Sequence, residues 1–464
     1  MIRFALLVAT VFLLSFSGTA QTQEPSIKKD APEVEEDISV STEHPRLLLV
    51  PRRLRLLRRE RERDSPRWRQ LETLVAGKAA MAEPGFAWAF YYQISGAKEF
   101  GKQAVDWALS PQAKDLRQLA IVFDWCQPLL SEEQSKTLAG KLANGAVALA
   151  KSKGIPDLRD RTMALVALVG HGQNDVIEAQ LKSIVNEWWR KEIAPGLRIG
   201  HKEVSRLDSY ALFELLHTMR DSTNVDLRED AGKYFKELPA YHILSYYPAV
   251  FPAAENEYRI PFYTSDGEPD LRVAALSRAA DLAMVAYDTN AQETQFVQSW
   301  LIHDRFMMRG TFGITYEFLW ANPYQPGLSY YHLPLIQHHS SSGRLVLRST
   351  WDDDASWFHF SGQQAQMFEN GARKDLKMSE RPKPIEVAAT MLYFYYEGIR
   401  IPAESQLGET MYLLGLKPDT RYDLEADDRE VEEVNSDAGG ILPVKLPPKS
   451  KFVIRLHVTP VGRP

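Results

Sequence analysis

A change in sequence pattern near residue 328 is the feature that most limits what this chain can fold into. From Trp68 to Asp304, apolar residues recur at helical spacing, and breakers such as Ser110-Pro111 keep the runs short. After Leu328 the chain changes to strand-like alternation, with Gly and Pro between the runs. The sequence therefore predicts the α+β class, with a domain of paired helices followed by an antiparallel β-sandwich.

A hairpin is the clearest predicted strand pair in the second part. Gly343–Thr350 alternates in the way a strand does, three aspartates predict a turn, and Ala355–Phe360 forms the returning strand. In this hairpin Trp357 and His359 share one face, and the intervening phenylalanine lies on the other. The stretch that follows, residues 363–386, is polar and contains two prolines, so we expect it to be irregular.

The first twenty residues have the pattern of a secretory signal. Met1–Ala20 contains Arg3, then an apolar run, and ends in small residues. The run is shorter than the roughly 20 residues that a membrane span needs. We therefore expect a periplasmic or secreted protein with no stable membrane span after cleavage. The acidic segment 21–43 is expected to be a flexible leader, which places the helical domain at 44–327 and the sandwich at 328–464.

The charge balance argues against a nucleic-acid partner. The chain has 464 residues, with 55 Lys and Arg against 61 Asp and Glu, and its formal net charge is −6. Binding to phosphate backbones requires a cationic surface. The arginines of Pro51–Arg63 are interleaved with leucines at helical spacing and with acids, so we interpret them as the solvated face of an amphipathic helix.

We expect neither a cofactor nor a bound metal. The single cysteine, Cys126, can form neither an intramolecular disulfide nor a thiolate metal cluster. The adjacent His338 and His339 would point to opposite faces of a strand, which makes them a poor chelating pair. The sequence has no Gly-rich phosphate loop, no nucleophile elbow and no His-Glu-x-x-His motif.

Three stretches of the chain resemble the heparinase II/III-like family of polysaccharide lyases. They are His44-Pro45-Arg46-Leu47-Leu48-Leu49, then Ala120-Ile121-Val122-Phe123-Asp124-Trp125 with Leu130-Ser131-Glu132-Glu133, and Leu347-Arg348-Ser349-Thr350-Trp351-Asp352 with Ala355-Ser356-Trp357. The resemblance implies an incomplete (α/α) toroid stacked on a β-sandwich, with an acidic polysaccharide bound in a cleft. It also implies cleavage by β-elimination. In that reaction a donor neutralises the uronate carboxylate, and Tyr or His residues exchange protons with the sugar.

The sequence departs from this family after the hairpin. The family carries His-x-His-x-Asp-type residues there, whereas Gly362–Gly371 contains no His and no Asp. Two hypotheses follow: an exported polysaccharide lyase that acts on a uronate-containing glycan, or a non-catalytic glycan-binding or scaffold protein on the same fold. A third hypothesis, a helical carbohydrate hydrolase, needs two carboxylates that flank one bond. Its candidate carboxylates are Asp124, Glu214, Asp266 and Asp270.

The predicted helix Val204–Arg220 carries the candidate catalytic residues. Arg206, Tyr210, Glu214 and His217 recur at helical spacing and form one polar stripe. In a lyase, Arg206 would neutralise the uronate, Tyr210 would act as base and acid, and His217 would assist. The alternatives are a solvated helix face with an Arg/Glu pair, or a tyrosine that is buried for structural reasons.

Five further residues are candidates for substrate binding. His171 and Asn174 lie on a turn between predicted helices, where a capping role is the alternative. His201 follows a glycine, and Tyr258 belongs to an aromatic-rich segment that fits either a sugar-stacking rim or a core. His359 would reach the cleft from the sandwich side.

Overall fold

The helical part of the chain begins soon after the first described residue. The computed structural model describes residues 38–252, 257–304, 308–362, 364–380, 382–394, 398–401, 410–426, 431–445 and 454–461, so the predicted signal and most of the predicted leader lie outside it. Residues 38–464 belong to one compact unit. Ile38 and Val40 are buried, so the core includes residues that the sequence assigns to the leader.

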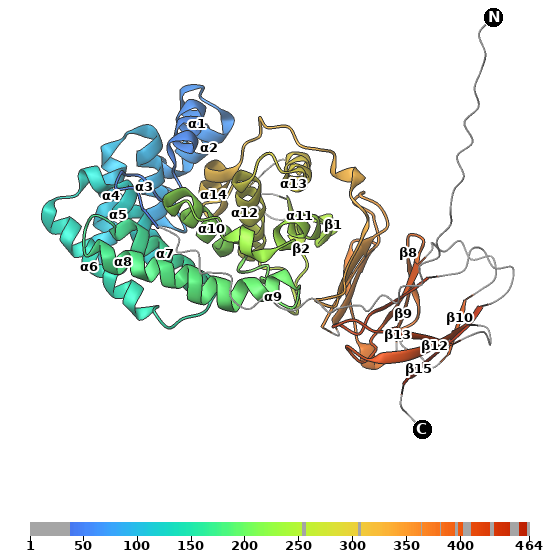
Figure 1. Cartoon of the computed structure of the whole chain (residues 1–464). Helices are drawn as coiled ribbons and strands as arrows, with labels where there is room; N and C mark the ends of the chain where they lie inside the picture. Colours follow the sequence, from blue (N-terminus) through green and yellow to red (C-terminus); the bar gives the residue numbers. More distant parts are fainter. Residues whose placement is uncertain are drawn as a thin grey trace, which may run out of the picture. The chain divides into compact units, whose positions relative to one another are not determined.

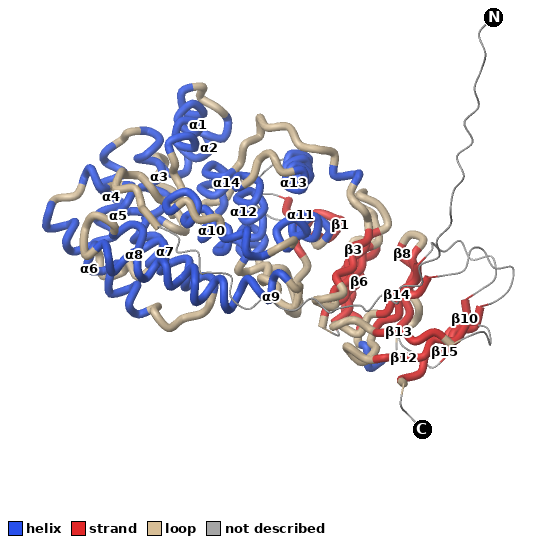
Figure 2. Tube along the Cα trace, in the orientation of Figure 1, coloured by secondary structure: helices blue, strands red, loops and turns tan. Residues whose placement is uncertain are grey.

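Fourteen α-helices are described in the first part of the chain (Figures 1 and 2). Most α-helices pack against helices close to them in sequence, for example α3 with α4, α5 with α7, and α10 with α7 and α12. They are α1 (Pro51–Glu62), α2 (Pro66–Val75), α3 (Pro84–Ser95), α4 (Lys98–Leu109), α5 (Leu116–Trp125), α6 (Glu132–Ala148), α7 (Ile155–Leu168), α8 (Asn174–Ser183), α9 (Ala194–Arg198), α10 (Ser209–Thr223), α11 (Tyr234–Leu244), α12 (Leu271–Tyr287), α13 (Gln292–His303) and α14 (Gly313–Trp320).

Local capping chemistry sets several of these boundaries. A capping box begins α6, because Ser131 and Gln134 bond each other's backbone N–H. Helix α10 starts at Ser209, five residues later than the sequence predicts. The Ser205 hydroxyl accepts a hydrogen bond from the backbone N–H of Asp208 at 3.1 Å, and this turn leaves Arg206 outside the helix.

Short strands follow in three sheets, after a hairpin of β1 (Tyr246–Pro252) and β2 (Glu257–Pro261) within the helical part. The first sheet has the order β3-β4-β5-β6-β7, the middle sheet β14-β11-β9-β8, and the outer sheet β10-β15-β12-β13. Their strands are β3 (Ile336–His339), β4 (Arg344–Arg348), β5 (Trp357–Ser361), β6 (Gln364–Glu369), β7 (Ala372–Leu376), β8 (Ile385–Val387), β9 (Thr390–Phe394), β10 (Gly398–Ile401), β11 (Thr410–Leu414), β12 (Arg421–Ala426), β13 (Glu432–Asn435), β14 (Leu442–Lys445) and β15 (Ile454–Pro460).

Alternation along the strands explains how the sheets stack. In β5, Phe358 and Phe360 pack against Leu392 of the middle sheet, whereas Trp357 belongs to the helical core and donates a hydrogen bond to the Leu244 carbonyl at 2.7 Å. A second cluster joins the middle and outer sheets. The predicted fold class is therefore confirmed, and all described strand pairs are antiparallel except β9 with β11.

The sequence prediction for residues 363–386 is wrong. This stretch contains the hairpin β6–β7, closed by Asn370-Gly371. Both turn residues have positive φ, 53° and 76°, which is the backbone of the two-residue turn that Asn-Gly favours. The Asn370-Gly371 pair was the sequence signal that could have predicted this hairpin. Among the residues that the structure describes, no helix has the length and apolarity of a membrane span.

Candidate functional site

Two of the three family-like stretches contact each other and have a structural role. The Asp124 carboxylate lies 2.6 Å from His44 Nδ1 and accepts hydrogen bonds from the backbone N–H groups of Arg46 at 2.9 Å and Leu47 at 2.8 Å. Trp125 donates to the Leu47 carbonyl at 2.9 Å. The third stretch forms the β4–β5 hairpin. These contacts hold the entry segment against α5 and leave Asp124 fully buried.

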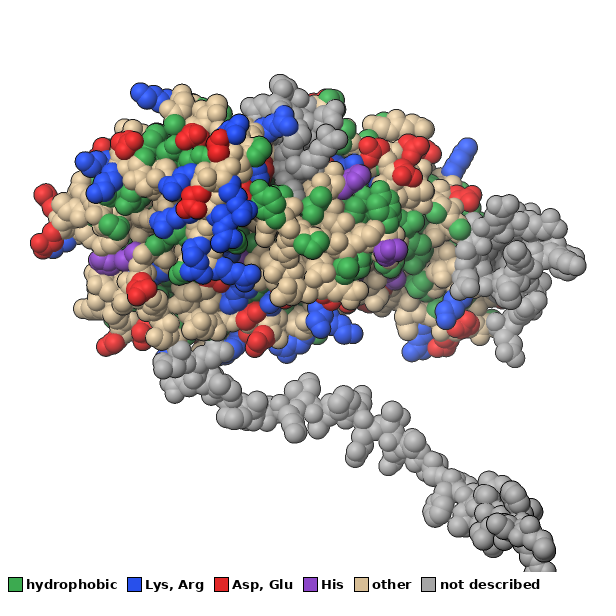
Figure 3. All heavy atoms as spheres, turned by 90° about the horizontal axis from the view of Figure 1, so that it is seen from above, with side chains coloured by type: hydrophobic (Ala, Val, Ile, Leu, Met, Phe, Trp, Pro, Cys, Tyr) green, Lys and Arg blue, Asp and Glu red, His purple; other side chains and the backbone are tan. Residues whose placement is uncertain are grey.

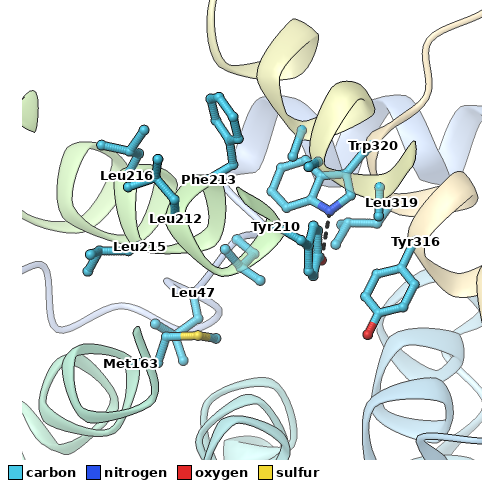
Figure 4. Packing of buried hydrophobic residues seen from close by; sticks show 14 of the residues in the cluster. Leu47, Met163, Tyr210, Leu212, Phe213, Leu215, Leu216, Tyr316, Leu319 and Trp320 are labelled. Atoms are coloured by element: carbon cyan, nitrogen blue, oxygen red, sulfur yellow. Dashed lines mark hydrogen bonds between the residues drawn. The ribbon is translucent and has the colours of Figure 1, made fainter. Parts of the chain in front are cut away.

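Tyr210 and Glu214 lie in a buried ionic network on α10. The Glu214 carboxylate accepts hydrogen bonds from Arg117 at 2.7 Å, from Arg159 at 2.5 Å and from the Tyr210 hydroxyl at 2.8 Å. Tyr210 in turn accepts from Trp320 Nε1 at 3.1 Å (Figure 4). Burial, and then the Glu214 charge, hold the pKa of Tyr210 well above its ordinary value. A neutral, fully bonded phenol is better suited to packing than to proton abstraction.

His217 positions two arginines, Arg53 and Arg220. Its Nε2 lies 3.0 Å from the Ala283 carbonyl, which can only accept, so Nε2 carries the proton. Nδ1 then accepts from Arg53 at 3.4 Å and Arg220 at 3.5 Å. Burial lowers the pKa of His217 to about 4, so the ring is neutral near pH 7.

Arg206 belongs to a different cluster, between α10 and the sheets. It lies 3.7 Å from Asp281 and donates to the His242 carbonyl at 3.1 Å. Asp281 also contacts His242 Nδ1 and the Tyr246 hydroxyl, both at 2.6 Å. The predicted stripe is therefore divided: Arg206, Tyr210 and His217 each bond to different partners, and none lies on a solvated face.

The five predicted binding residues are dispersed. His171 is exposed and contacts Gln127 at 3.2 Å, and Asn174 is the first residue of α8, not its N-cap, and accepts from the N–H of the preceding Gly170 at 2.9 Å. His201 is exposed in the turn before α10. Tyr258 pairs with Phe251 in β1–β2, and its side chain lies outside the described residues. His359 is buried and stacks on the Phe262 ring at 4.1 Å.

Buried His359 gives a testable pH dependence. Burial, and then Arg344, lower its pKa to about 3, so the folded state binds this proton less readily than the unfolded state. A depressed histidine pKa means that stability falls as the pH falls from the ordinary value, about 6.5, toward the folded value. Between pH 7 and pH 4.5, we expect the free energy of unfolding of His359→Gln to fall by about 2 kcal/mol less than that of the wild type, as measured by urea unfolding. Equal losses in both proteins would contradict this.

A cavity lies along α1, and we call it the arginine pocket. Its volume is about 680 Å³. Its walls come from α1, the start of α2, the C-terminal ends of α10, α12 and α14, and the segments that follow α12 and α14. Six arginines and three acids line it: Arg52, Arg53, Arg59, Arg63, Arg67 and Arg220 with Glu60, Asp221 and Asp288. Figure 3 views the chain from the side of α1 and shows Lys and Arg side chains gathered over part of the helical region.

Internal contacts fix the inner arginines of this pocket. Arg53 stacks on the Trp320 ring at 4.4 Å and lies 3.9 Å from Asp221, and burial lowers its pKa to about 10. Arg220 stacks on the Tyr287 ring at 3.6 Å and bonds Asp221 at 2.9 Å. Burial alone would raise the pKa of Asp221, but the neighbouring guanidinium groups of Arg53 and Arg220 contribute to holding it below the ordinary value.

The outer arginines are available to a ligand. Arg52 and Arg59 are exposed, and neither has an ion pair or side-chain hydrogen bond within the described part of the chain. Beside them lie Tyr324, 64% exposed, and Leu56, 44% exposed. Free guanidinium groups next to an exposed aromatic ring can bind carboxylates or sulfates while a sugar ring packs on the tyrosine.

Sequence reasoning missed this pocket. It assigned the α1 arginines to a solvated face, although Arg52, Leu56, Arg59 and Arg63 recur at a spacing that places them on one side of the helix. Among the described residues, no group of three or more His, Cys, Asp or Glu side chains could hold a metal ion.

Comparisons with known proteins identify no family for the chain. No family model matches it, and no curated protein matches it. Solved structures do match, including a mutant of the heparan sulfate lyase HepC from Pedobacter heparinus, with a TM-score of 0.36 and 12% identity over 82% of this chain and 76% of that one. A glycoside hydrolase matches with a TM-score of 0.29 and 10% identity over 81% of this chain and 71% of that one. At these values neither likeness supports an activity.

Proposed function

We propose that this chain binds an acidic, uronate-containing glycan in the arginine pocket. The observation that carries the proposal is the pair of exposed, unpartnered guanidinium groups of Arg52 and Arg59, which line the same cavity as the exposed ring of Tyr324. Carboxylates on a glycan would pair with the arginines, and a sugar face would pack on the tyrosine. The net charge of −6 is compatible with this, because a local cationic surface is enough.

In this proposal the stripe residues support the pocket and do not contact the ligand. His217 orients Arg53 and Arg220. Tyr210 accepts a hydrogen bond from the indole N–H of Trp320, and Arg53 stacks on that indole ring. Their burial favours these positioning roles over the catalytic roles predicted from the sequence, which stay predictions.

A second candidate function is β-elimination in the same pocket, and the observation that favours it is that Tyr324, unlike the buried Tyr210, is exposed beside the arginines. The reaction needs a cation beside the uronate carboxylate and a group that removes the neighbouring proton. The Tyr324 hydroxyl lies 3.5 Å from Glu60, and partial burial and that carboxylate raise its pKa. Elimination by Tyr324 would therefore accelerate with increasing pH.

A binding titration tests the proposed function. Pure protein is titrated with heparan-type, chondroitin-type, alginate and pectate chains, with fully methyl-esterified pectin as the uncharged control. We expect at least one acidic chain to bind, with an affinity that falls as salt is raised, and the esterified chain not to bind. Equal binding of pectate and its ester, or no binding of any acidic chain, would contradict the proposal. Ultraviolet absorbance of the same mixtures reports unsaturated uronate products, which only β-elimination generates.

A further inference from the structure

A second cavity, separate from the arginine pocket, lies where the β3–β4 turn meets the helical part. Its volume is about 360 Å³, in the range of sites for small ligands. Three segments build it: α9 and the turn after it, the start of α11, and the turn between β3 and β4. None of its lining residues lines the arginine pocket.

The charges around this cavity favour an anion. Lys233 is exposed and has no ion pair or side-chain hydrogen bond with any described residue. Arg198 directs Nε and Nη2 to the Asp230 carbonyl, which leaves Nη1 without a bond in the described structure. Of the two acids of the lining, Glu203 pairs with Arg344, and Glu237 lies 3.5 Å from the His339 ring. The four Lys and Arg side chains of the lining outnumber these two acids.

Polar atoms of the β3–β4 hairpin lack partners at the same place. The Ser342 hydroxyl, His339 Nε2 and Arg344 Nε are buried, and none has a hydrogen-bond partner among the described residues. All three residues line this cavity. Buried polar groups in folded proteins are normally satisfied, so three unsatisfied groups around one cavity indicate a missing hydrogen-bonding occupant. Burial lowers the pKa of His339 to about 4, so its ring is neutral near pH 7, and with Nδ1–H toward Glu237 its Nε2 can accept only from a protonated oxygen, such as the O–H of a monohydrogen phosphate.

Two glycines let the segments approach this closely. Gly200 has a φ of 78°, and a Cβ there would overlap the Ser341 side chain of the hairpin. Gly232 has a φ of 61°, and its Cβ would lie 3.0 Å from Arg198 Cγ. Both positions favour glycine for backbone conformation as well as for space. The cavity walls are therefore set by close backbone packing, which makes this a formed site.

We propose that this cavity binds a small oxyanion, such as a phosphate or sulfate group. Lys233 and Arg198 would supply charge, and the Ser341 and Ser342 hydroxyls would supply hydrogen bonds to its oxygens. Bound there, the anion would link the β3–β4 turn to α9 and α11. The inference is independent of glycan binding in the arginine pocket.

Calorimetry and thermal unfolding of the full chain test this proposal. The probes are inorganic phosphate, inorganic sulfate and glucose 6-phosphate, with sodium chloride at matched ionic strength as the control. We expect at least one probe to bind and to raise the unfolding temperature, because a ligand that binds only the folded state stabilises it. Comparing glucose 6-phosphate with inorganic phosphate shows whether the cavity prefers a phosphate ester or the free ion.

Variants locate the site. We expect Lys233→Gln and Ser342→Ala each to weaken oxyanion binding about tenfold, because each removes one direct contact. Lys236→Gln is the matched control, since Lys236 is an exposed lysine in the first turn of α11, three residues after Lys233, and does not line the cavity. No binding by the wild type, or equal weakening in Lys233→Gln and Lys236→Gln, would overturn the proposal. Unchanged glycan binding in Lys233→Gln would show that the two sites are separate.

Discussion

Glu214→Gln is expected to lower the free energy of unfolding by about 3 kcal/mol, because it removes the charge that two buried guanidinium groups share and leaves each with one other acidic partner, Glu83 or Asp160. The substitution keeps the shape of the side chain, so a cavity does not contribute to the loss. Arg117 and Arg159 converge on this carboxylate, and both have pKa values raised above the ordinary value, despite burial, chiefly by its charge. Urea unfolding at neutral pH measures the loss.

The matched control is Glu133→Gln on the exposed side of α6. We expect this variant to stay within about 0.5 kcal/mol of the wild type, as surface substitutions generally do. Similar losses in the two variants would contradict the role assigned to the Glu214 network. A stable, soluble Glu214→Gln protein that lost only glycan turnover would instead support the catalytic interpretation of α10.

Asp124→Asn is expected to destabilise the chain by about 3 kcal/mol, because a buried acceptor of several hydrogen bonds becomes partly a donor. The amide nitrogen would face either the backbone N–H groups of Arg46 and Leu47 or the His44 ring. We also expect easier proteolysis near the start of α1, since this carboxylate holds the entry segment in place. Urea unfolding and limited proteolysis measure the two effects.

Asp106→Asn, on the exposed face of α4, is the control for this substitution. It should leave both stability and proteolysis unchanged. An Asp124→Asn protein as stable as this control would show that the family-like stretches do not depend on their mutual contact.

The helical part was predictable because its signal is local. Apolar spacing and breakers identify most helices, and the Ser131-x-x-Gln134 pattern is a local start signal for α6. The start of α10 was not predictable from spacing, since the Ser205 turn competes with the helix. The hairpin β6–β7 was missed because its strands are polar, although the Asn370-Gly371 turn was a usable signal.

The candidate site was harder to predict because it depends on tertiary contacts. The stripe on α10 is polar in sequence, yet both of its sides are apolar, with Leu212, Phe213, Leu215 and Leu216 buried around it (Figure 4). A helix that is apolar on several faces is a central helix, and its polar residues are then paired inside the core. The arginine pocket needs helix ends that lie far apart in sequence, such as those of α10 and α14, and no local pattern brings these together.

Glycan binding by a double variant tests the central claim most directly. Arg52→Gln with Arg59→Gln removes two of the exposed, unpartnered guanidinium groups of the pocket, and Arg55→Gln with Lys102→Gln removes the same charge from exposed positions outside it. With the best-binding acidic glycan at low salt, we expect the first pair to weaken binding by about tenfold or more and the second pair to leave it nearly unchanged. Equal weakening by both pairs would mean that net charge alone attracts the glycan, and would contradict a binding site in the arginine pocket.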